Sequence, residues 1–146
     1  MMNGRDFLTV AKALLNAATE AAWRSAVSRA YYAAFHVARQ MMEDLGFTVP
    51  RGDRAHAYLW LRLSNCGDVQ VQDAGRRLNN LRGQRNHADY DIAVPLLHAT
   101  AAGQVQIAER IIQLLDAATV EPTRSQITNA MIVYERDVLH DVTWHP

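Results

Sequence analysis

Side chains that could act on a phosphodiester lie close together near the middle of the chain. Residues 81–91 read LRGQRNHADYD and include Arg82, Arg85, Asn86 and His87. Arginine carries a permanent, fork-shaped cation that binds phosphate, and histidine exchanges a proton near neutral pH. Arg82 and His87 are therefore candidate catalytic residues. The alternative interpretation is a helix end held together by ion pairs.

An arginine and a histidine are the residue types that cleavage of a phosphodiester needs, and in RNA such cleavage can proceed without a metal ion. In that chemistry the 2′-hydroxyl attacks the adjacent phosphorus, a histidine moves the protons, and an arginine offsets the charge on the phosphoryl oxygens. We assign the acid/base role to His87, the phosphoryl clamp to Arg82, and positioning of the RNA backbone to Arg85 and Asn86. At 100° per residue, His87 lies about 140° round a helix from Arg82. The two side chains would meet across a frayed helix end or across a two-fold axis between two copies.

A second set of polar residues follows one face of a long predicted helix. Ser25, Arg29, Tyr32 and His36 are spaced by four, three and four residues, among alanine, valine and methionine. An arginine on such a face needs a partner, because a buried unpaired charge is costly. We favour a structural ion pair between Arg29 and Asp89. In the alternative, Arg29, Tyr32 and His36 are substrate-binding residues.

The elements that position these residues are helices. Alanine-rich apolar rows at helical spacing, and an almost complete lack of strand-like alternation, predict an all-α protein. Thr19 is a candidate N-cap and Gly46 a candidate stop for the longest helix. The predicted helices span residues 6–15, 19–45, 54–64, 69–87, 96–119 and 124–140.

This order of helices predicts an up-and-down bundle of four to five helices with an additional C-terminal helix. Residues 1–120 would form the bundle. Residues 121–146 would form a last helix and tail, either in the same domain or packed on another copy. Trp144, in a polar tail, is a candidate anchor for a partner surface.

Composition limits the class of protein. The chain has 146 residues, with 15 basic and 15 acidic side chains. A neutral chain argues against an extended nucleic-acid surface and leaves room only for a small local one. The single cysteine, Cys66, excludes an internal disulfide. We see no signal peptide and no membrane span, and expect a cytoplasmic protein. No phosphate-binding glycine loop or zinc motif is present, so we expect no cofactor and no metal.

Two motifs resemble those of a known family. Residues 28–36, SRAYYAAFH, resemble the second-helix signature of the HEPN domains, and residues 85–91, RNHADYD, are similar to their fourth-helix signature. His56 lies where these domains often carry a histidine. The resemblance spans residues 6–119 and implies a bundle of four to five helices that is usually a homodimer.

The resemblance also implies functions. Many HEPN domains are metal-independent ribonucleases with an Arg–x4–6–His motif, which Arg82 and His87 satisfy, although Gly83 stands where a polar residue is usual. Others pair with minimal nucleotidyltransferases as toxin and antitoxin. Our first hypothesis is a homodimeric endoribonuclease toxin that cleaves RNA, with a nucleotidyltransferase antitoxin. The neutral charge and Gly83 favour the alternatives. These are a non-catalytic module that binds nucleotide or such a partner, and a structural adaptor with internal ion pairs of Arg29, Arg85 and Asp89.

Overall fold

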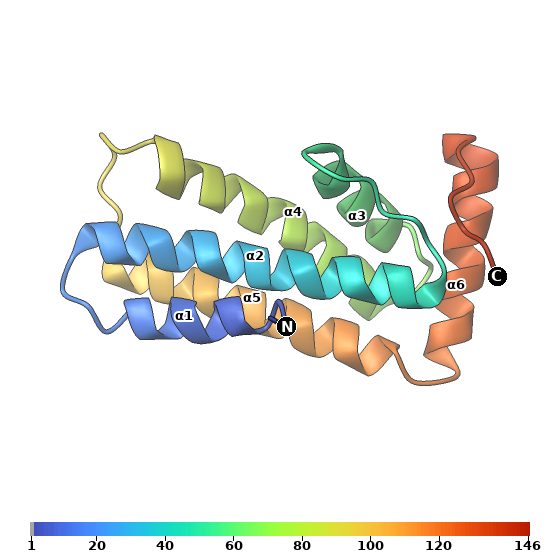
Figure 1. Ribbon diagram of the computed structural model, residues 1–146, viewed down its shortest axis with the longest axis horizontal. Coiled ribbons are helices and arrows are strands. Elements are labelled where there is room, and N and C mark those ends of the chain that lie inside the picture. The colour runs from blue at the N-terminus through green and yellow to red at the C-terminus, as the bar shows by residue number, and fades with distance from the viewer. Residues whose placement is uncertain (1) are drawn as a thin grey trace.

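The computed structural model describes residues 2–146, which form helices joined by short loops (Figure 1). No strand occurs in this part of the chain apart from one isolated bridge between Phe47 and Trp144. The helices are α1 (Asp6–Leu14), α2 (Glu20–Leu45), α3 (Arg54–Ser64), α4 (Val69–Tyr90), α5 (His98–Ala118) and α6 (Thr123–Tyr134), followed by a π-helical turn (Glu135–Leu139).

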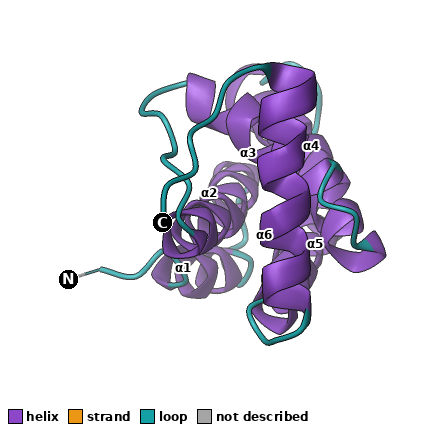
Figure 2. Cartoon of the chain, turned by 90° about the vertical axis from the view of Figure 1, so that its right-hand side faces the viewer, coloured by secondary structure: helices purple, strands orange, loops and turns teal. Residues whose placement is uncertain are grey.

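Four of these helices form the body of the bundle. α2 packs against α1, α4 and α5, and all four run roughly along the long axis of the molecule. The short α3 packs mainly on α4, and α6 crosses one end of the bundle (Figure 2). The predicted all-α fold and its additional C-terminal helix are confirmed. No helix of residues 2–146 combines the length and the apolar character needed to cross a membrane.

Local signals explain where α2 begins and ends. The Thr19 side chain accepts a hydrogen bond from the backbone N–H of Ala22, as the N-cap prediction requires. Gly46 follows the helix with φ of 108°, a conformation that favours glycine. A Cβ at Gly46 would also lie 2.7 Å from Nε1 of Trp144. In its middle α2 presents small buried residues to its neighbours, which lets α1, α4 and α5 approach it closely. These are Ala26, Ala30, Ala33, Ala34 and Ala38.

An N-cap and a glycine also explain how α4 begins and how it packs against α3. Asp68 caps α4 by accepting a hydrogen bond from the backbone N–H of Val71. A Cβ at Gly75 would lie 2.8 Å from the backbone nitrogen of Ser64, so glycine lets the two helices approach each other closely here. α4 ends at Tyr90, three residues beyond the predicted end at residue 87.

The C-terminal segment differs from its prediction. The single helix expected over residues 124–140 is instead α6 followed by the π-helical turn. Trp144 packs against this chain's own core, and its Nε1 donates a hydrogen bond to the carbonyl of Leu45 at 2.8 Å. The indole nitrogen is therefore already bonded within this chain, and a role for Trp144 in anchoring a partner stays a prediction.

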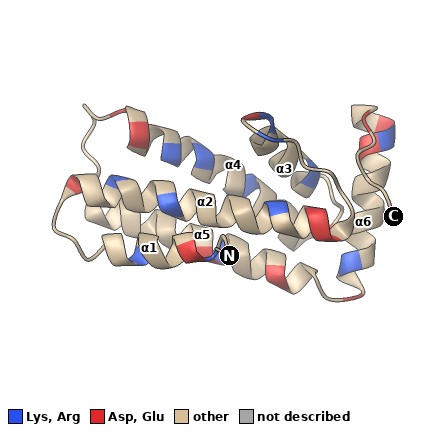
Figure 3. Ribbon diagram, in the orientation of Figure 1, with Lys and Arg blue, Asp and Glu red and all other residues tan. Residues whose placement is uncertain are grey.

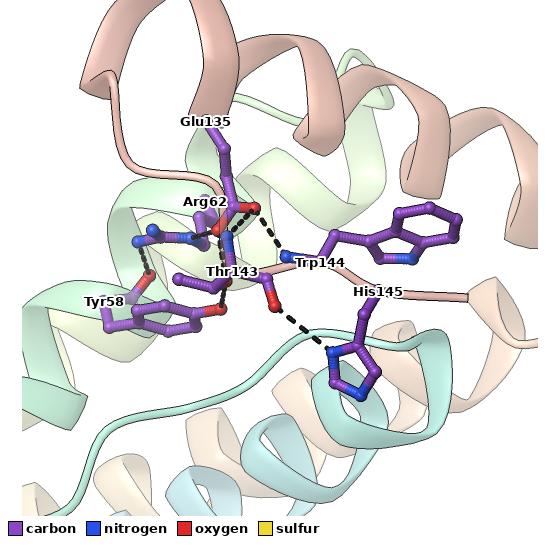
Figure 4. Close-up of polar contacts among 6 residues, drawn as sticks. All are labelled: Tyr58, Arg62, Glu135, Thr143, Trp144 and His145. Atoms are coloured by element: carbon purple, nitrogen blue, oxygen red, sulfur yellow. Dashed lines mark hydrogen bonds and ion pairs between the residues drawn. The ribbon is translucent and has the colours of Figure 1, made fainter.

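A buried polar cluster ties this segment to α3, and we call it the C-terminal lock (Tyr58, Arg62, Glu135, Thr143 and Trp144; Figure 4). Glu135 is fully buried, and one of its carboxylate oxygens lies 2.7 Å from Nε of Arg62. Glu135 also accepts hydrogen bonds from the hydroxyl and backbone N–H of Thr143 and from the backbone N–H of Trp144. The Arg62 guanidinium lies 3.5 Å from the centre of the Tyr58 ring, and the Tyr58 hydroxyl hydrogen-bonds that of Thr143. The lock was not predicted.

Candidate functional site

The centre of the candidate site is Arg85, whose guanidinium bridges α4 and α2. Its Nε lies 3.0 Å from the Asp89 carboxylate, in the geometry of an ion pair rather than a straight hydrogen bond. Its two Nη atoms donate to the Tyr32 hydroxyl at 2.7 Å and to the side-chain oxygen of Asn86 at 2.8 Å. Ser28 of α2 also donates to Asp89. Both Nη atoms of Arg85 therefore have acceptors and Asp89 offsets its charge, while its Nε makes an ion pair but no hydrogen bond.

The predicted ion pair between Arg29 and Asp89 is not formed, because Asp89 pairs with Arg85 instead. Ser28 is the α2 residue that faces Asp89, and the next residue along a helix is turned by about 100°. Arg29 therefore points toward α1, with its guanidinium carbon 5.4 Å from the centre of the Phe7 ring and 5.8 Å from that of Tyr32. Within residues 2–146 no ion pair includes Arg29.

His36 also lies on the α1 side of α2. Its ring stacks on Phe7 with centroids 5.6 Å apart. Burial and the nearby Arg39 lower the pKa of His36, which favours the neutral imidazole. The polar face predicted on α2 is thus divided, with Tyr32 bonded to α4 and His36 stacked on α1. A substrate-binding role for His36 stays a prediction.

Arg82 is half-buried, and its surroundings are the most unusual of the site. Its buried Nε has no hydrogen-bond partner in the part of the chain that the structure describes, and no ion pair there includes Arg82. Burial lowers the pKa of His56, and the charges of Arg82 and Arg85 lower it further. The Tyr31 hydroxyl hydrogen-bonds Nδ1 of His56, and burial raises the tyrosine's pKa. The Arg82 cation therefore lies near a neutral, buried Tyr31–His56 pair.

We call Arg29, Tyr32, Arg82 and Arg85 the arginine face. Figure 3 marks the Lys and Arg positions along α2 and α4. Arg29 and Arg82 have no acidic partner among the described residues, whereas the charge of Arg85 is offset by Asp89. Sequence reasoning found all four residues but missed Tyr31, which no spacing distinguishes from its neighbours in the buried row.

His87 lies on a different side of α4. Its side chain is 70% exposed, and its Nδ1 contacts the carboxylate of Asp91, one turn further along. It lines a cavity of about 310 Å³, which lies away from the arginine face. Other residues of this cavity are Arg24, Val27, Gln84, Leu96 and Gln104.

Within one chain the structure does not bring Arg82 and His87 together. α4 stays helical to Tyr90, so the frayed end that could have brought them together is absent. His87 follows Arg82 by five positions, which corresponds to a rotation of about 140° round the helix. Of the two predicted routes, only a second copy of the chain could join them. Nor does any group of three His, Cys, Asp or Glu side chains in residues 2–146 come close enough to hold a metal ion.

These observations define an all-helical bundle protein with a cationic face formed by its second and fourth helices. The model of the HEPN domain family matches residues 1–118. The chain belongs to this family, as the motifs on α2 and α4 indicated. No curated protein and no solved structure matches the chain. The family match includes the whole arginine face and His87, but it ends before Glu135 and Thr143 of the C-terminal lock.

Proposed function

We propose that the protein is a HEPN binding module whose arginine face holds phosphate groups of RNA or of a nucleotide. The observation that carries this proposal is the buried Nε of Arg82, which has no acceptor among the described residues. A buried donor without a partner costs about 1–3 kcal/mol. A phosphate supplies charged acceptors in the geometry of an arginine fork, and so would remove that cost.

The local charge supports the same proposal. Asp89 offsets Arg85, while no ion pair among the described residues includes Arg29 or Arg82, so their positive charges are not offset. The chain as a whole is neutral, with 15 basic and 15 acidic side chains. The excess charge is therefore local, which suits a few phosphates rather than a long stretch of RNA backbone.

Fluorescence anisotropy with a labelled single-stranded RNA of twelve nucleotides, and separately with a labelled ATP analogue, tests this proposal. We expect Arg82→Ala to weaken binding of at least one probe by about tenfold or more, the value of a charge-assisted hydrogen bond. For the RNA, the slope of log affinity against log salt should fall by about 0.7. Arg76→Ala is the matched control, since Arg76 is an exposed arginine on the same helix. Equal binding by the Arg82→Ala and Arg76→Ala proteins would contradict the proposal.

The contact between His87 and Asp91 favours a second candidate function, a metal-independent endoribonuclease. An Nδ1–H that donates to Asp91 leaves Nε2 free to take the proton of a 2′-hydroxyl or to protonate the leaving 5′-oxygen. Arg82 would offset the charge that gathers on the phosphoryl oxygens. Because these residues lie apart within one chain, a complete site would combine Arg82 of one copy with His87 of another.

A mixing experiment tests this candidate. The wild-type protein should fragment RNA in the presence of a chelator, and Arg82→Ala and His87→Ala should each abolish cleavage. When the Arg82→Ala and His87→Ala chains are co-expressed, each mixed dimer has one complete site of two. If half of the dimers are mixed, we expect about a quarter of the wild-type activity. No recovery on mixing would place both residues in the same chain's site. No cleavage by the wild-type protein would leave only the binding module.

The surroundings of His87 support a homodimer. Tyr90, Ile92, Val94 and Leu97 are each between 64% and 74% exposed, and they follow His87 closely along the chain. Exposed apolar side chains that gather at one place often mark an interface. We infer a cytoplasmic homodimer, consistent with the single cysteine, and a minimal nucleotidyltransferase as its candidate antitoxin. Sedimentation of the wild-type and Ile92→Asp proteins tests the dimer, and co-purification with a neighbouring nucleotidyltransferase tests the partner.

A further inference from the structure

One arginine of α2 binds the end of α4. The last four carbonyls of an α-helix lack partners within the helix. Nη1 of Arg24 donates to the carbonyls of Ala88 at 3.0 Å and of His87 at 3.4 Å. The Arg24 side chain is only 11% exposed. A side chain from a neighbouring helix therefore caps α4 next to His87.

The same side chain also holds the turn that follows α4. Arg24 donates to the carbonyls of Asp91 and Val94. Glu20, one turn earlier on α2, accepts a hydrogen bond from the backbone N–H of Leu96 at 2.5 Å, and its carboxylate lies 3.8 Å from Nε of Arg24. Residues 87–96 are thus attached to α2 by two charged side chains.

We propose that Arg24 is a positioning residue for His87. This inference rests on the second candidate function, in which His87 moves protons. The His87–Asp91 contact is exposed, and an exposed ion pair alone does little to fix the geometry of its members. The orientation of Asp91 depends on its backbone, which directly follows α4 and which Arg24 holds. Arg24 therefore keeps Asp91 against Nδ1 and leaves Nε2 facing outward.

Lysine could not replace this arginine. The guanidinium has five donors in a planar fork and meets four carbonyls here, whereas an ammonium group is a compact point charge with three donors. Arg24→Lys keeps the charge and loses the fork. This substitution therefore separates positioning from electrostatics.

The ¹⁵N chemical shifts of the His87 ring report which nitrogen carries the proton, and they can be measured whether or not the protein cleaves RNA. In the wild-type protein, at a pH where the ring is neutral, we expect the Nδ1–H form that donates to Asp91. Arg24→Lys should shift the ring nitrogens toward an average of the two tautomers, as Asp91→Asn should. The double variant should show no further change. Arg5→Lys is the matched control, because Arg5 pairs with Asp116 on another surface.

A second variant guards against loss of the fold. Glu20→Gln removes one charge from the attachment, and should produce a smaller shift in the same direction. Wild-type ring shifts in both the Arg24→Lys and Glu20→Gln proteins, with only a lower melting temperature, would overturn the proposal, since that is the signature of a merely structural role. If RNA is cleaved, Arg24→Lys should also lower kcat by about tenfold to a hundredfold with little change in KM. Changed ring shifts in a protein that cleaves no RNA would refute the nuclease and leave the positioning contact in place.

Discussion

The C-terminal lock and the arginine face contain the same residue types, but their charged groups are partnered differently. Each places an arginine against a tyrosine and a carboxylate. In the lock, the Arg62 and Glu135 side chains are 4% and 0% exposed, and the carboxylate accepts several hydrogen bonds. In the arginine face, Arg85 pairs with the Asp89 carboxylate and donates to Tyr32, whereas Arg82 has a buried donor without an acceptor and no carboxylate beside it among the described residues. A charge that is fully partnered holds the fold together, and a charge that is left over is available to a ligand.

The two regions also differ in their relation to the family. The arginine face lies wholly within residues 1–118, which the HEPN model matches. Of the lock, Tyr58 and Arg62 lie within the match, whereas Glu135 and Thr143 lie beyond it. The lock therefore joins the HEPN part of the chain to a segment that the family model does not describe.

The largest expected effect comes from breaking the lock. Glu135→Ala should lower the free energy of unfolding by about 3–5 kcal/mol, because it leaves the Arg62 charge buried without its partner. Urea denaturation measures this loss. Replacing both members, as Arg62→Met with Glu135→Leu, should cost far less. A single variant as stable as the wild type would show that the ion pair does not hold the segment.

A smaller effect is expected where only one neutral group leaves the lock. Thr143→Val removes the hydroxyl that Tyr58 and Glu135 share, at a cost of about 1–2 kcal/mol. Thr128→Val is the matched control, since the Thr128 hydroxyl donates only to a carbonyl of its own helix. Chemical denaturation of both proteins should show the loss for Thr143 alone. Equal losses would mean that the hydroxyl contributes nothing specific to the lock.

The stability that the C-terminal lock contributes should depend on pH. Burial alone would raise the pKa of Glu135, but the Thr143 hydrogen bonds and Arg62 outweigh it and lower that pKa below its ordinary value. A carboxyl with a lowered pKa in the folded state adds stability above its unfolded pKa, and that stability is lost as the pH falls through the folded value. The stability gap between the wild-type and Glu135→Gln proteins should therefore narrow from about pH 7 to about pH 3. A gap that does not change with pH would contradict this assignment.

The smallest effect on stability, with the opposite sign, is expected in the arginine face. Arg82→Met removes a buried donor that has no acceptor, so the free energy of unfolding should stay the same or rise by about 1 kcal/mol. Arg76→Met, at an exposed position of the same helix, controls for the change of residue type. A marked loss of stability in the Arg82→Met protein would show that Arg82 has a structural partner, and would weaken the phosphate-binding proposal.

Local signals made much of the fold predictable. The cap at Thr19 and the stop at Gly46 bound α2 in the structure as they did in the sequence, because both act within a few residues. The end of α4 was placed three residues too early, because the group that caps it, Arg24, comes from another helix. The ends of α2, which nearby residues set, were thus predicted correctly, whereas the end of α4, which a residue of another helix caps, was not.

The site shows the same limit. Arg85 and Asp89 are four residues apart on one helix, a spacing that could have identified their ion pair before the pairing with Arg29 was chosen. No spacing could reveal the lock, because Arg62 and Glu135 are 73 residues apart, and Tyr58 and Thr143 are 85 apart. The relation of Arg82 to His56 likewise depends on how α3 packs on α4.

The span of the lock has a consequence during synthesis of the protein. Arg62 leaves the ribosome 73 residues before Glu135, which is an interval of roughly 4 to 15 seconds at the usual 5–20 residues per second. Throughout that time Arg62 lacks the carboxylate with which it pairs in the folded protein, so α3 cannot complete its contacts with the C-terminal segment. The segment that carries Glu135 therefore decides when the lock can form.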